Sequence, residues 1–335
     1  MADIALIGAG SWGTSLSVLL SGNGHSVTVW SRSSEEARML DMQRENKDKL
    51  PGVRIPGNIR FTADLETAVA HAEQVVFVVP SQTVRQNARA LARMLAPDAI
   101  LVCCSKGLEE TTGLRLSEII MAEIPGHPIV GLYGPSHAEE VAIGIPTTVV
   151  SASLERDAAE AVQDAFMAPA FRVYTSSDLA GAEIGSALKN IIALCAGISD
   201  GLGFGDNSRA ALMTRGLTEI ARLGVALGGN AKTFSGLTGI GDLIVTCTSK
   251  LSRNWNAGYL IGKGATPKEA TEKVRMVVEG VSATRAVRFL ALEKKIGMPI
   301  SEEAYRILFE GKDAMTAVRE LMTRSRKHET EEPGW

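Results

Sequence analysis

The chain has 335 residues, of which 45% are hydrophobic and 22% charged, and its formal net charge is −3. This length is enough for two domains with their own cores, and the small negative charge argues against a general nucleic-acid-binding surface. The sequence contains no apolar run of about eighteen residues and no basic leader before the first predicted strand. We therefore expect a soluble, cytoplasmic protein with no nucleic-acid partner and no membrane anchor.

The first predicted strand, residues 4–7, leads directly into the sequence Gly-Ala-Gly-Ser-Trp-Gly at residues 8–13, and a helix is expected over residues 14–21. In this strand–turn–helix context, the glycine spacing predicts that the pyrophosphate of a dinucleotide binds at the helix N-terminus. Gly8 would allow the tight turn, Gly10 the approach of phosphate to the backbone, and Gly13 the close packing of helix on strand. The alternative is a glycine-rich loop without a ligand.

The second predicted strand, residues 25–30, bears on the choice of cofactor. An NAD-selective site usually has an acidic residue near the end of this strand, but no acid occupies positions 30–34. Arg32 offers a guanidinium that suits a 2′-phosphate. We therefore predict NADP(H) as the cofactor, with NAD(H) also accepted. The alternative is that Arg32 is a solvated loop charge.

The rest of the first half alternates between helical and extended patterns. Polar or amphipathic helices are expected over residues 34–46, from residue 64, and from residue 81 to about 95. The further predicted strands are residues 59–61, 75–79, 100–104, 128–133, 147–150 and 171–174. Such alternation, with β-branched runs in several strands, predicts an α/β fold with a mostly parallel, doubly wound sheet.

From residue 180 onward almost every segment has helical periodicity, for example residues 183–198, 210–227 and 280–295. We place a boundary near residues 176–182, where Asp178 belongs to a helix N-cap sequence. The predicted domains are therefore residues 1–180, an α/β domain, and residues 181–335, an all-helical domain. The charged tail from Arg324 lacks an apolar period and is expected to fray.

The four cysteines, Cys103, Cys104, Cys195 and Cys247, form no Cys-x-x-Cys pair, and the five histidines are scattered. We therefore predict no metal site and no disulfide framework. Cys103 and Cys104 fall in an apolar strand and are expected to be buried free thiols.

Polar segments follow two of the predicted strands, at the sheet edge where open α/β folds bind ligands. Lys106 follows the strand that ends at residue 104, and Gly134 and Ser136 follow the strand that ends at residue 133. Lys106 could bind an anionic substrate beside a nicotinamide, or could be an ordinary surface lysine. The second segment can present backbone donors and a hydroxyl to a phosphate or a carbonyl.

Lys189 lies in the middle of a predicted apolar helix and is the only lysine between Lys106 and Lys232. Such a lysine either extends to solvent or is held at depth for a chemical task. Burial would lower its pKa and make it a usable acid or base near neutral pH. The spacing alone leaves both readings open.

A glycine-rich segment, residues 236–247, contains Asp242 and is followed by Ser252, Arg253 and Asn254 at a predicted helix start. This is not a core pattern. Arg253 suits bidentate phosphate binding, and Asp242 could orient a lysine or a substrate hydroxyl. The alternative is a capped loop that connects two helices.

These motifs, in this order from residue 4 to about residue 320, resemble the bacterial NAD(P)-dependent glycerol-3-phosphate dehydrogenase family. The shared features are GAGSWG at 8–13, SKG at 105–107, GPSHAEE at 134–140, LKN at 188–190, GLTGIGDLIVTC at 236–247 and SRN at 252–254. The resemblance implies a Rossmann domain followed by an all-helical domain like that of 6-phosphogluconate dehydrogenase. It also implies reversible reduction of dihydroxyacetone phosphate to sn-glycerol 3-phosphate for glycerophospholipid synthesis. A homodimer is expected.

The resemblance also implies roles for individual residues. Lys189 is the expected catalytic proton donor and acceptor. The expected substrate-binding residues, besides Lys189, are Lys106, Gly134, Ser136, Asp242, Ser252, Arg253 and Asn254. The expected cofactor-binding residues, besides the glycines of the turn (Gly8, Gly10, Gly13), are Ser11, Trp12, Arg32, Lys106, Ala138, Arg253, Val277 and Glu279. The family often has basic or aromatic residues around positions 32, 33 and 49, and Ser33 departs from the more basic versions.

Two other functions share parts of this pattern. A β-hydroxyacid dehydrogenase or a ketopantoate-reductase-like enzyme would have the same layout and a catalytic lysine, but a carboxylate substrate. The sequence around Arg253 suits a phosphate better. A redox-sensing NADP-binding regulator would have no need for a lysine in an apolar helix facing the cofactor.

Overall fold

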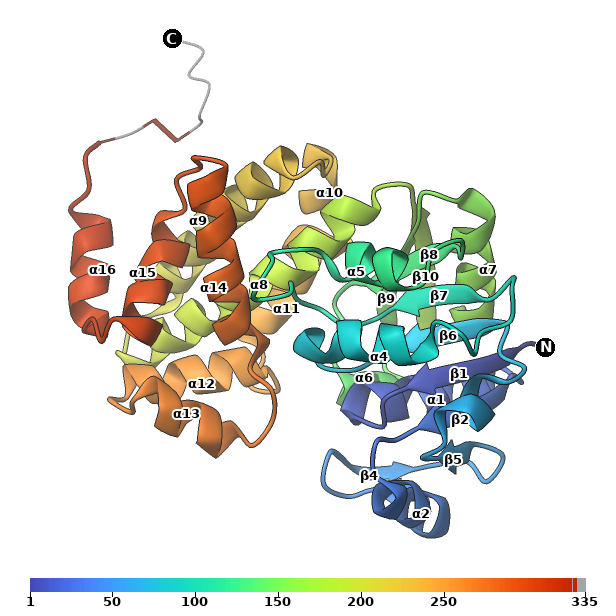
Figure 1. Cartoon of the computed structure of the whole chain (residues 1–335). Coiled ribbons are helices and arrows are strands. Elements are labelled where there is room, and N and C mark those ends of the chain that lie inside the picture. The colour runs from blue at the N-terminus through green and yellow to red at the C-terminus, as the bar shows by residue number, and fades with distance from the viewer. Residues whose placement is uncertain (327, 330–335) are drawn as a thin grey trace.

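The computed structural model describes residues 1–326, 328 and 329. It has two parts, a sheet flanked by helices and a group of helices, with α8 (Leu179–Gly201) running between them (Figure 1). The predicted α/β fold followed by an all-helical region is confirmed. The tail that was predicted to fray, from Arg324 onward, includes residues 327 and 330–335, which lie outside the described residues.

The first part contains an eight-stranded sheet with the strand order β10-β9-β8-β7-β6-β1-β2-β5. Its strands are β1 (Asp3–Ile7), β2 (Ser26–Trp30), β5 (Arg60–Thr62), β6 (Gln74–Phe77), β7 (Ile100–Cys103), β8 (Ile129–Tyr133), β9 (Thr147–Ala152) and β10 (Phe171–Ser176). From β1 the chain first adds β2 and β5 on one side, and then adds β6 to β10 on the other side, so the order of the strands reverses at β1. The glycine turn follows β1, which is where such folds bind ligands.

All neighbouring strands are parallel except β8 and β9, so β9 and β10 run against the rest of the sheet. The connection from β8 to β9 carries only α6 (Ala138–Ala142), a helix of five residues. Such a helix is about 8 Å long, whereas a five-residue strand spans about 16 Å. The chain therefore re-enters the sheet from the edge at which β8 ends. The residue pattern within each strand carries no information on this reversal.

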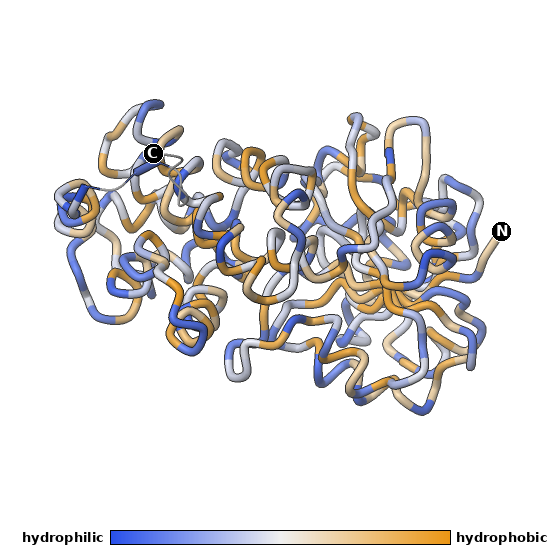
Figure 2. Tube along the Cα trace, turned by 90° about the horizontal axis from the view of Figure 1, so that it is seen from above, coloured by the Kyte–Doolittle hydropathy of each residue, from blue (hydrophilic) through white to orange (hydrophobic). Residues whose placement is uncertain are grey.

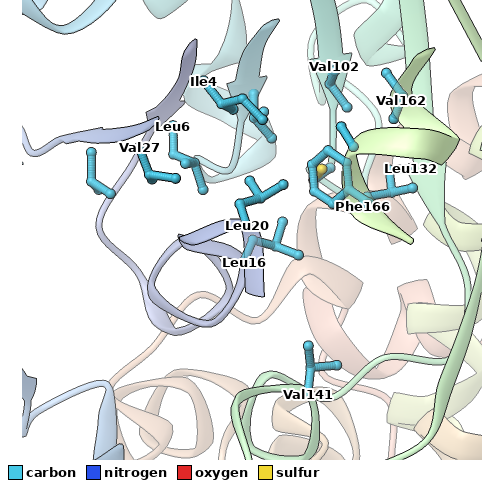
Figure 3. Close-up of a cluster of buried hydrophobic side chains, with 14 of the residues drawn as sticks. Ile4, Leu6, Leu16, Leu20, Val27, Val102, Leu132, Val141, Val162 and Phe166 are labelled. Atoms are coloured by element: carbon cyan, nitrogen blue, oxygen red, sulfur yellow. The ribbon is translucent and has the colours of Figure 1, made fainter. Parts of the chain in front are cut away.

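Helices cover both faces of the sheet and form a separate core on each. One core contains apolar side chains of α1 (Ser11–Gly22) and α7 (Arg156–Phe166), and Figure 3 shows Leu16, Leu20 and Phe166 of these helices beside the strands. The other core contains side chains from the helices α3 (Leu65–Val69), α4 (Val84–Leu91) and α5 (Leu116–Glu123). Along the chain, hydrophobic residues concentrate in the middle of the sheet (Figure 2).

Two predicted helices are shorter in the structure. The helix expected over residues 34–46 is α2 (Ser34–Gln43), and the one expected from residue 81 to 95 is a short 3₁₀ turn, η1 (Ser81–Thr83), followed by α4. Arg44 ends α2 with a left-handed φ of 52°. The chain then forms a small antiparallel hairpin, β3 (Glu45–Asn46) with β4 (Leu50–Arg54), which the sequence did not predict.

The second part is all-helical. After α8 it contains α9 (Asp206–Ala226), α10 (Ala231–Phe234), a π-helical turn η2 (Leu237–Gly241), α11 (Asp242–Thr248), α12 (Arg253–Gly262), α13 (Pro267–Val274), α14 (Glu279–Glu293), α15 (Pro299–Phe309) and α16 (Ala314–Met322). The side chain of Asp178 caps α8 by accepting a hydrogen bond from the Gly181 N–H at 2.9 Å. The helix thus begins inside the predicted boundary region, while the division at residue 180 stays a prediction.

Helix α8 is the core of this second part. It is long and apolar enough to cross a membrane, but 89% of its most apolar window is buried inside the protein. Its apolar residues pack against those of α9, α11 and α14. Leu108, from the loop after β7, is buried in the same cluster and so joins the two parts of the molecule.

Glycines bring α8 and α12 close together. A Cβ atom on Gly258 of α12 would lie 2.0 Å from the Leu194 carbonyl oxygen, and one on Gly197 of α8 would lie 2.0 Å from the Trp255 carbonyl oxygen. These distances are impossible for real atoms, so any larger residue must push the helix backbones apart.

Gly258→Ala should therefore lower the free energy of unfolding by about 3 kcal/mol, because the added methyl group overpacks a rigid contact between backbones. Thermal and urea unfolding would measure the loss. Gly22→Ala is the matched control, since Gly22 also lies in a helix but has open space around its Cβ position. It should be neutral or stabilise by up to about 1 kcal/mol. Equal melting of the two variants would contradict the close helix packing.

Candidate active site

The glycine turn after β1 has the geometry that a dinucleotide pyrophosphate requires. Gly8 has a φ of +124°, and a Cβ on Gly13 would lie 2.1 Å from the Gly8 carbonyl oxygen. A Cβ on Gly10 would have open space around it, and Gly10, the N-cap residue of α1 (which begins at Ser11), has no side chain to cap the helix. The turn therefore leaves backbone N–H groups and the positive end of the helix dipole available to an anion.

Trp12 lies in the first turn of α1 and packs with Leu50 and Val53 of the hairpin and with Ala138, the first residue of α6. Its indole nitrogen is buried and has no hydrogen-bond partner in the described part of the chain. The structure thus places Ser11, Trp12 and Ala138 around the turn. Arg32 is exposed two residues beyond the end of β2, next to the turn, since the Gly8 N–H donates to the Trp30 carbonyl oxygen at 3.0 Å.

Lys189 is buried at the junction between the two parts of the molecule, with 5% of its surface exposed. Its Nζ donates hydrogen bonds to a carboxylate oxygen of Asp242 and, at 2.8 Å, to the hydroxyl of Thr246. The reading in which this lysine extends to solvent is therefore wrong, and the helix holds it at depth. Asp242, the first residue of α11, is 0% exposed, so the carboxylate that accepts this hydrogen bond is also buried.

The loop after β7 adds a second cation to this cluster. Lys106 Nζ lies 3.0 Å from the other carboxylate oxygen of Asp242 and donates to the Gly134 carbonyl oxygen at 2.8 Å. The Ser136 hydroxyl donates to the same carbonyl oxygen at 3.0 Å. Five of the residues predicted for the substrate site, from both parts of the molecule, are thus joined by direct hydrogen bonds.

The cluster perturbs the pKa values of its own members. Burial lowers the pKa of the Lys189 ammonium to about 7, against the opposing effect of the Asp242 carboxylate. Burial acts to raise the pKa of Asp242, but the charges of Lys106 and Lys189 outweigh it and hold that pKa below its usual value. A lysine that changes charge near neutral pH beside a fixed carboxylate is suited to general acid–base catalysis.

The remaining predicted substrate residues lie at the start of α12. The Ser252 hydroxyl caps this helix by accepting from the Trp255 N–H at 3.2 Å, and Arg253 is exposed in its first turn. Asn254 is buried, and its amide donates to the Asn190 side chain at 2.9 Å and accepts from the Gly280 N–H at 2.8 Å. Asn254 therefore links α12 to α14 and to α8, at the residue that follows Lys189.

Glu279, the first residue of α14, ties the helical part to the sheet. Its carboxylate accepts hydrogen bonds from the N–H of Ser81, at 3.0 Å, and from the Ser81 hydroxyl. Burial raises the pKa of Glu279, and the nearby charge of Arg253 opposes that shift. Val277 is 43% exposed just before the helix.

Sequence reasoning missed Thr246 and Glu36. Thr246 lies one helical turn after Asp242, so a search for polar residues at i and i+4 would have found it. Glu36 lies six residues beyond the end of β2, but its carboxylate accepts a hydrogen bond from the hydroxyl of Ser31. An acidic group therefore does lie at the end of this strand, contrary to the expectation drawn from positions 30–34.

A doubly wound sheet with this glycine turn, and a buried lysine–carboxylate pair that Lys106 links to the strand ends, is typical of nicotinamide-dependent dehydrogenases. Two family models match the chain: the NAD-dependent glycerol-3-phosphate dehydrogenase N-terminus over residues 3–159 and its C-terminus over residues 178–319. The chain belongs to this family and is an oxidoreductase that uses NAD(P)+.

Individual relatives agree with the family models. The chain is 55% identical over 333 residues to the glycerol-3-phosphate dehydrogenase (NAD(P)+) of Moorella thermoacetica, with 99% of both chains covered. It is 53% identical over 332 residues to the enzyme of the same name from Desulfitobacterium hafniense, covering 99% of this chain and 94% of the relative. The crystal structure of glycerol-3-phosphate dehydrogenase from Coxiella burnetii matches with a TM-score of 0.93 at 36% identity, covering 96% and 99% of the two chains.

Proposed function

We propose that the chain catalyses the reversible reduction of dihydroxyacetone phosphate to sn-glycerol 3-phosphate, with Lys189 as the proton donor and acceptor. The observation that carries the proposal is the burial of Lys189 between Asp242 and Thr246, where the two parts of the molecule meet. The bound nicotinamide cofactor supplies the hydride that reduces the ketone carbon.

The protein's own residues then have separate tasks. The Lys189 ammonium stabilises the negative charge that develops on the ketone oxygen and donates a proton to it. Asp242 and Thr246 fix the position of the ammonium. In the reverse direction the neutral amine accepts the alcohol proton, which a pKa near 7 makes possible at neutral pH.

Arg253 and the backbone donors near it are the proposed binding site for the substrate phosphate. Binding of this remote group would hold the carbonyl near Lys189, so that phosphate binding energy contributes to orientation. The exposed position of Arg253 at the start of α12 supports this role.

The test of the function is nicotinamide absorbance with NADH or NADPH and one of three ketones. We expect rapid oxidation with dihydroxyacetone phosphate, and little with dihydroxyacetone or ketopantoate. A preference for the carboxylate substrate would instead favour the β-hydroxyacid dehydrogenase reaction. We further propose that the enzyme is a cytoplasmic homodimer that supplies glycerophospholipid synthesis, and sedimentation equilibrium would measure its mass.

Arg253→Ala should raise the KM for dihydroxyacetone phosphate by about 100-fold, since a charged hydrogen bond to phosphate contributes about 1.5–3 kcal/mol. At saturating cofactor, the effect on dihydroxyacetone, which has no phosphate, should be small. Steady-state kinetics with both ketones would separate the two. Arg275→Ala, which removes another exposed arginine, is the control. An unchanged KM in Arg253→Ala would remove this residue from the phosphate site.

A further inference from the structure

The carboxylate of Glu36 lies at the end of β2, although Glu36 belongs to the first turn of α2. It accepts a hydrogen bond from the Ser31 hydroxyl and forms an ion pair with the Lys49 ammonium. Ser31 is 1% exposed, whereas the side chains of Glu36 and Lys49 are 28% and 38% exposed. A buried hydroxyl therefore holds a solvent-accessible pair of opposite charges at this strand end.

The hairpin that carries Lys49 is fixed to the glycine turn. The side chain of Asn46, in β3, is 4% exposed and donates to the Ala9 carbonyl oxygen at 3.1 Å and to the Thr14 hydroxyl at 2.9 Å. On the other side, the end of β2 is bonded to the turn through the Gly8 N–H and the Trp30 carbonyl oxygen. Glu36 and Lys49 thus border the turn from two different elements.

We propose that Glu36 is a specificity-determining residue that sets the preference of the enzyme between NAD(H) and NADP(H). Its carboxylate would accept a hydrogen bond from the ribose 2′-hydroxyl of NAD(H) and repel the 2′-phosphate of NADP(H). Lys49 acts in the opposite sense and attracts that phosphate. This inference rests on the proposed function only in assuming that the glycine turn binds the cofactor.

The chemistry follows from where the ribose lies in this fold. A dinucleotide with its pyrophosphate on the N-terminus of α1 places the adenosine ribose at the end of the second strand, where an acid selects the free 2′-hydroxyl. A 2′-phosphate there would meet the Glu36 carboxylate as a like charge and would compete with it for Lys49. Arg32, exposed at the same strand end, adds a second cation that attracts the phosphate. One site with charges of both signs can therefore admit both cofactors, and the Glu36 carboxylate sets their ratio against the two cations.

The direct test is binding, measured by titration calorimetry with ADP-ribose and 2′-phospho-ADP-ribose. Glu36→Gln should shift the ratio of their affinities by about tenfold or more towards the phosphorylated nucleotide, because the like charge is gone. Lys49→Met should shift the ratio by a similar factor the other way. Both shifts should shrink at high salt. The exposed neighbour Glu35, changed to Gln, is the matched control and should leave the ratio unchanged.

Kinetics with NADH and NADPH should follow the binding data. The shift in cofactor preference should be seen in kcat/KM for each cofactor and not in kcat. An unchanged affinity ratio in folded Glu36→Gln would overturn the proposal, whatever the substrate. If Glu36→Gln did not fold, Lys49→Met would decide, since an unchanged ratio in that variant overturns the opposed-charge account. Failure of dihydroxyacetone phosphate to react, with both nucleotides bound, would overturn the proposed function and leave the role of Glu36 standing.

Discussion

Lys189→Ala should lower kcat for the reduction of dihydroxyacetone phosphate by about 10³-fold or more. The variant loses both the cation that stabilises the developing alkoxide and the proton that neutralises it, and each effect alone is worth about 10²-fold or more. Lys189 is the buried cation that bonds directly to both Asp242 and Thr246, and its part-buried neighbour in the cluster, Lys106, bonds to Asp242 from the other side. Stopped-flow measurement of nicotinamide absorbance would give the rate of the chemical step.

Binding of NADH and NADPH should survive in Lys189→Ala, because the glycine turn lies in a different element. Calorimetry would establish this, and thermal unfolding would show that the variant is folded. Lys232→Ala, which removes an exposed lysine of α10, is the control. Turnover near the wild-type rate in Lys189→Ala would exclude the lysine from catalysis. Its ion pair with Asp242 would then have only a structural role.

Local signals in the sequence were sufficient for the order and type of most elements. The apolar run at residues 4–7 and the glycines after it predicted β1, the turn and α1, because a turn that lacks Cβ atoms leaves a direct trace in the residue types. Asp178 likewise marked the start of α8. The direction of β9 and β10 left no such trace, since it depends on the length of α6 and not on the residues of the strands.

Site residues that stand in a recognisable local motif could be predicted from the sequence. Contacts between residues far apart in the chain could not. Asp242 was suspected of orienting a lysine, and the structure places it between two. The choice between a buried and a snorkelling Lys189 depended on α9, α11 and α14, which pack around α8 and whose arrangement the helical period does not specify. Glu36 escaped notice because a helix turn returns its carboxylate to Ser31, five residues earlier in the chain.

Asp242→Asn tests the electrostatic part of the proposed mechanism. The Asp242 carboxylate raises the pKa of Lys189 and so opposes burial and the charge of Lys106, which both lower it. Removing the negative charge should therefore lower the pKa of Lys189 below its value of about 7. The substitution also leaves two ammonium groups without their counter-ion, and we expect it to lower the free energy of unfolding by about 3–5 kcal/mol.

The pH profile gives the sign of this effect. Reduction of the ketone needs the ammonium form of Lys189, so kcat/KM in the wild type should fall as pH rises through about 7. Oxidation of the alcohol needs the neutral amine and should rise through the same range. In Asp242→Asn both transitions should move to lower pH. At neutral pH the variant should therefore lose more of its reduction activity than of its oxidation activity.

Lys106→Gln provides the opposite change at the same carboxylate. Because the charge of Lys106 lowers the pKa of Lys189, its removal should move both transitions to higher pH. The two variants would each lose activity, since both residues belong to the proposed substrate site, but a loss of packing or of substrate contacts cannot shift the profiles in opposite directions. Profiles that keep the wild-type midpoint in both variants would mean that the titrating group is not Lys189. Opposite shifts would identify the buried lysine as the acid and base of the reaction, with Asp242 holding its pKa near neutrality.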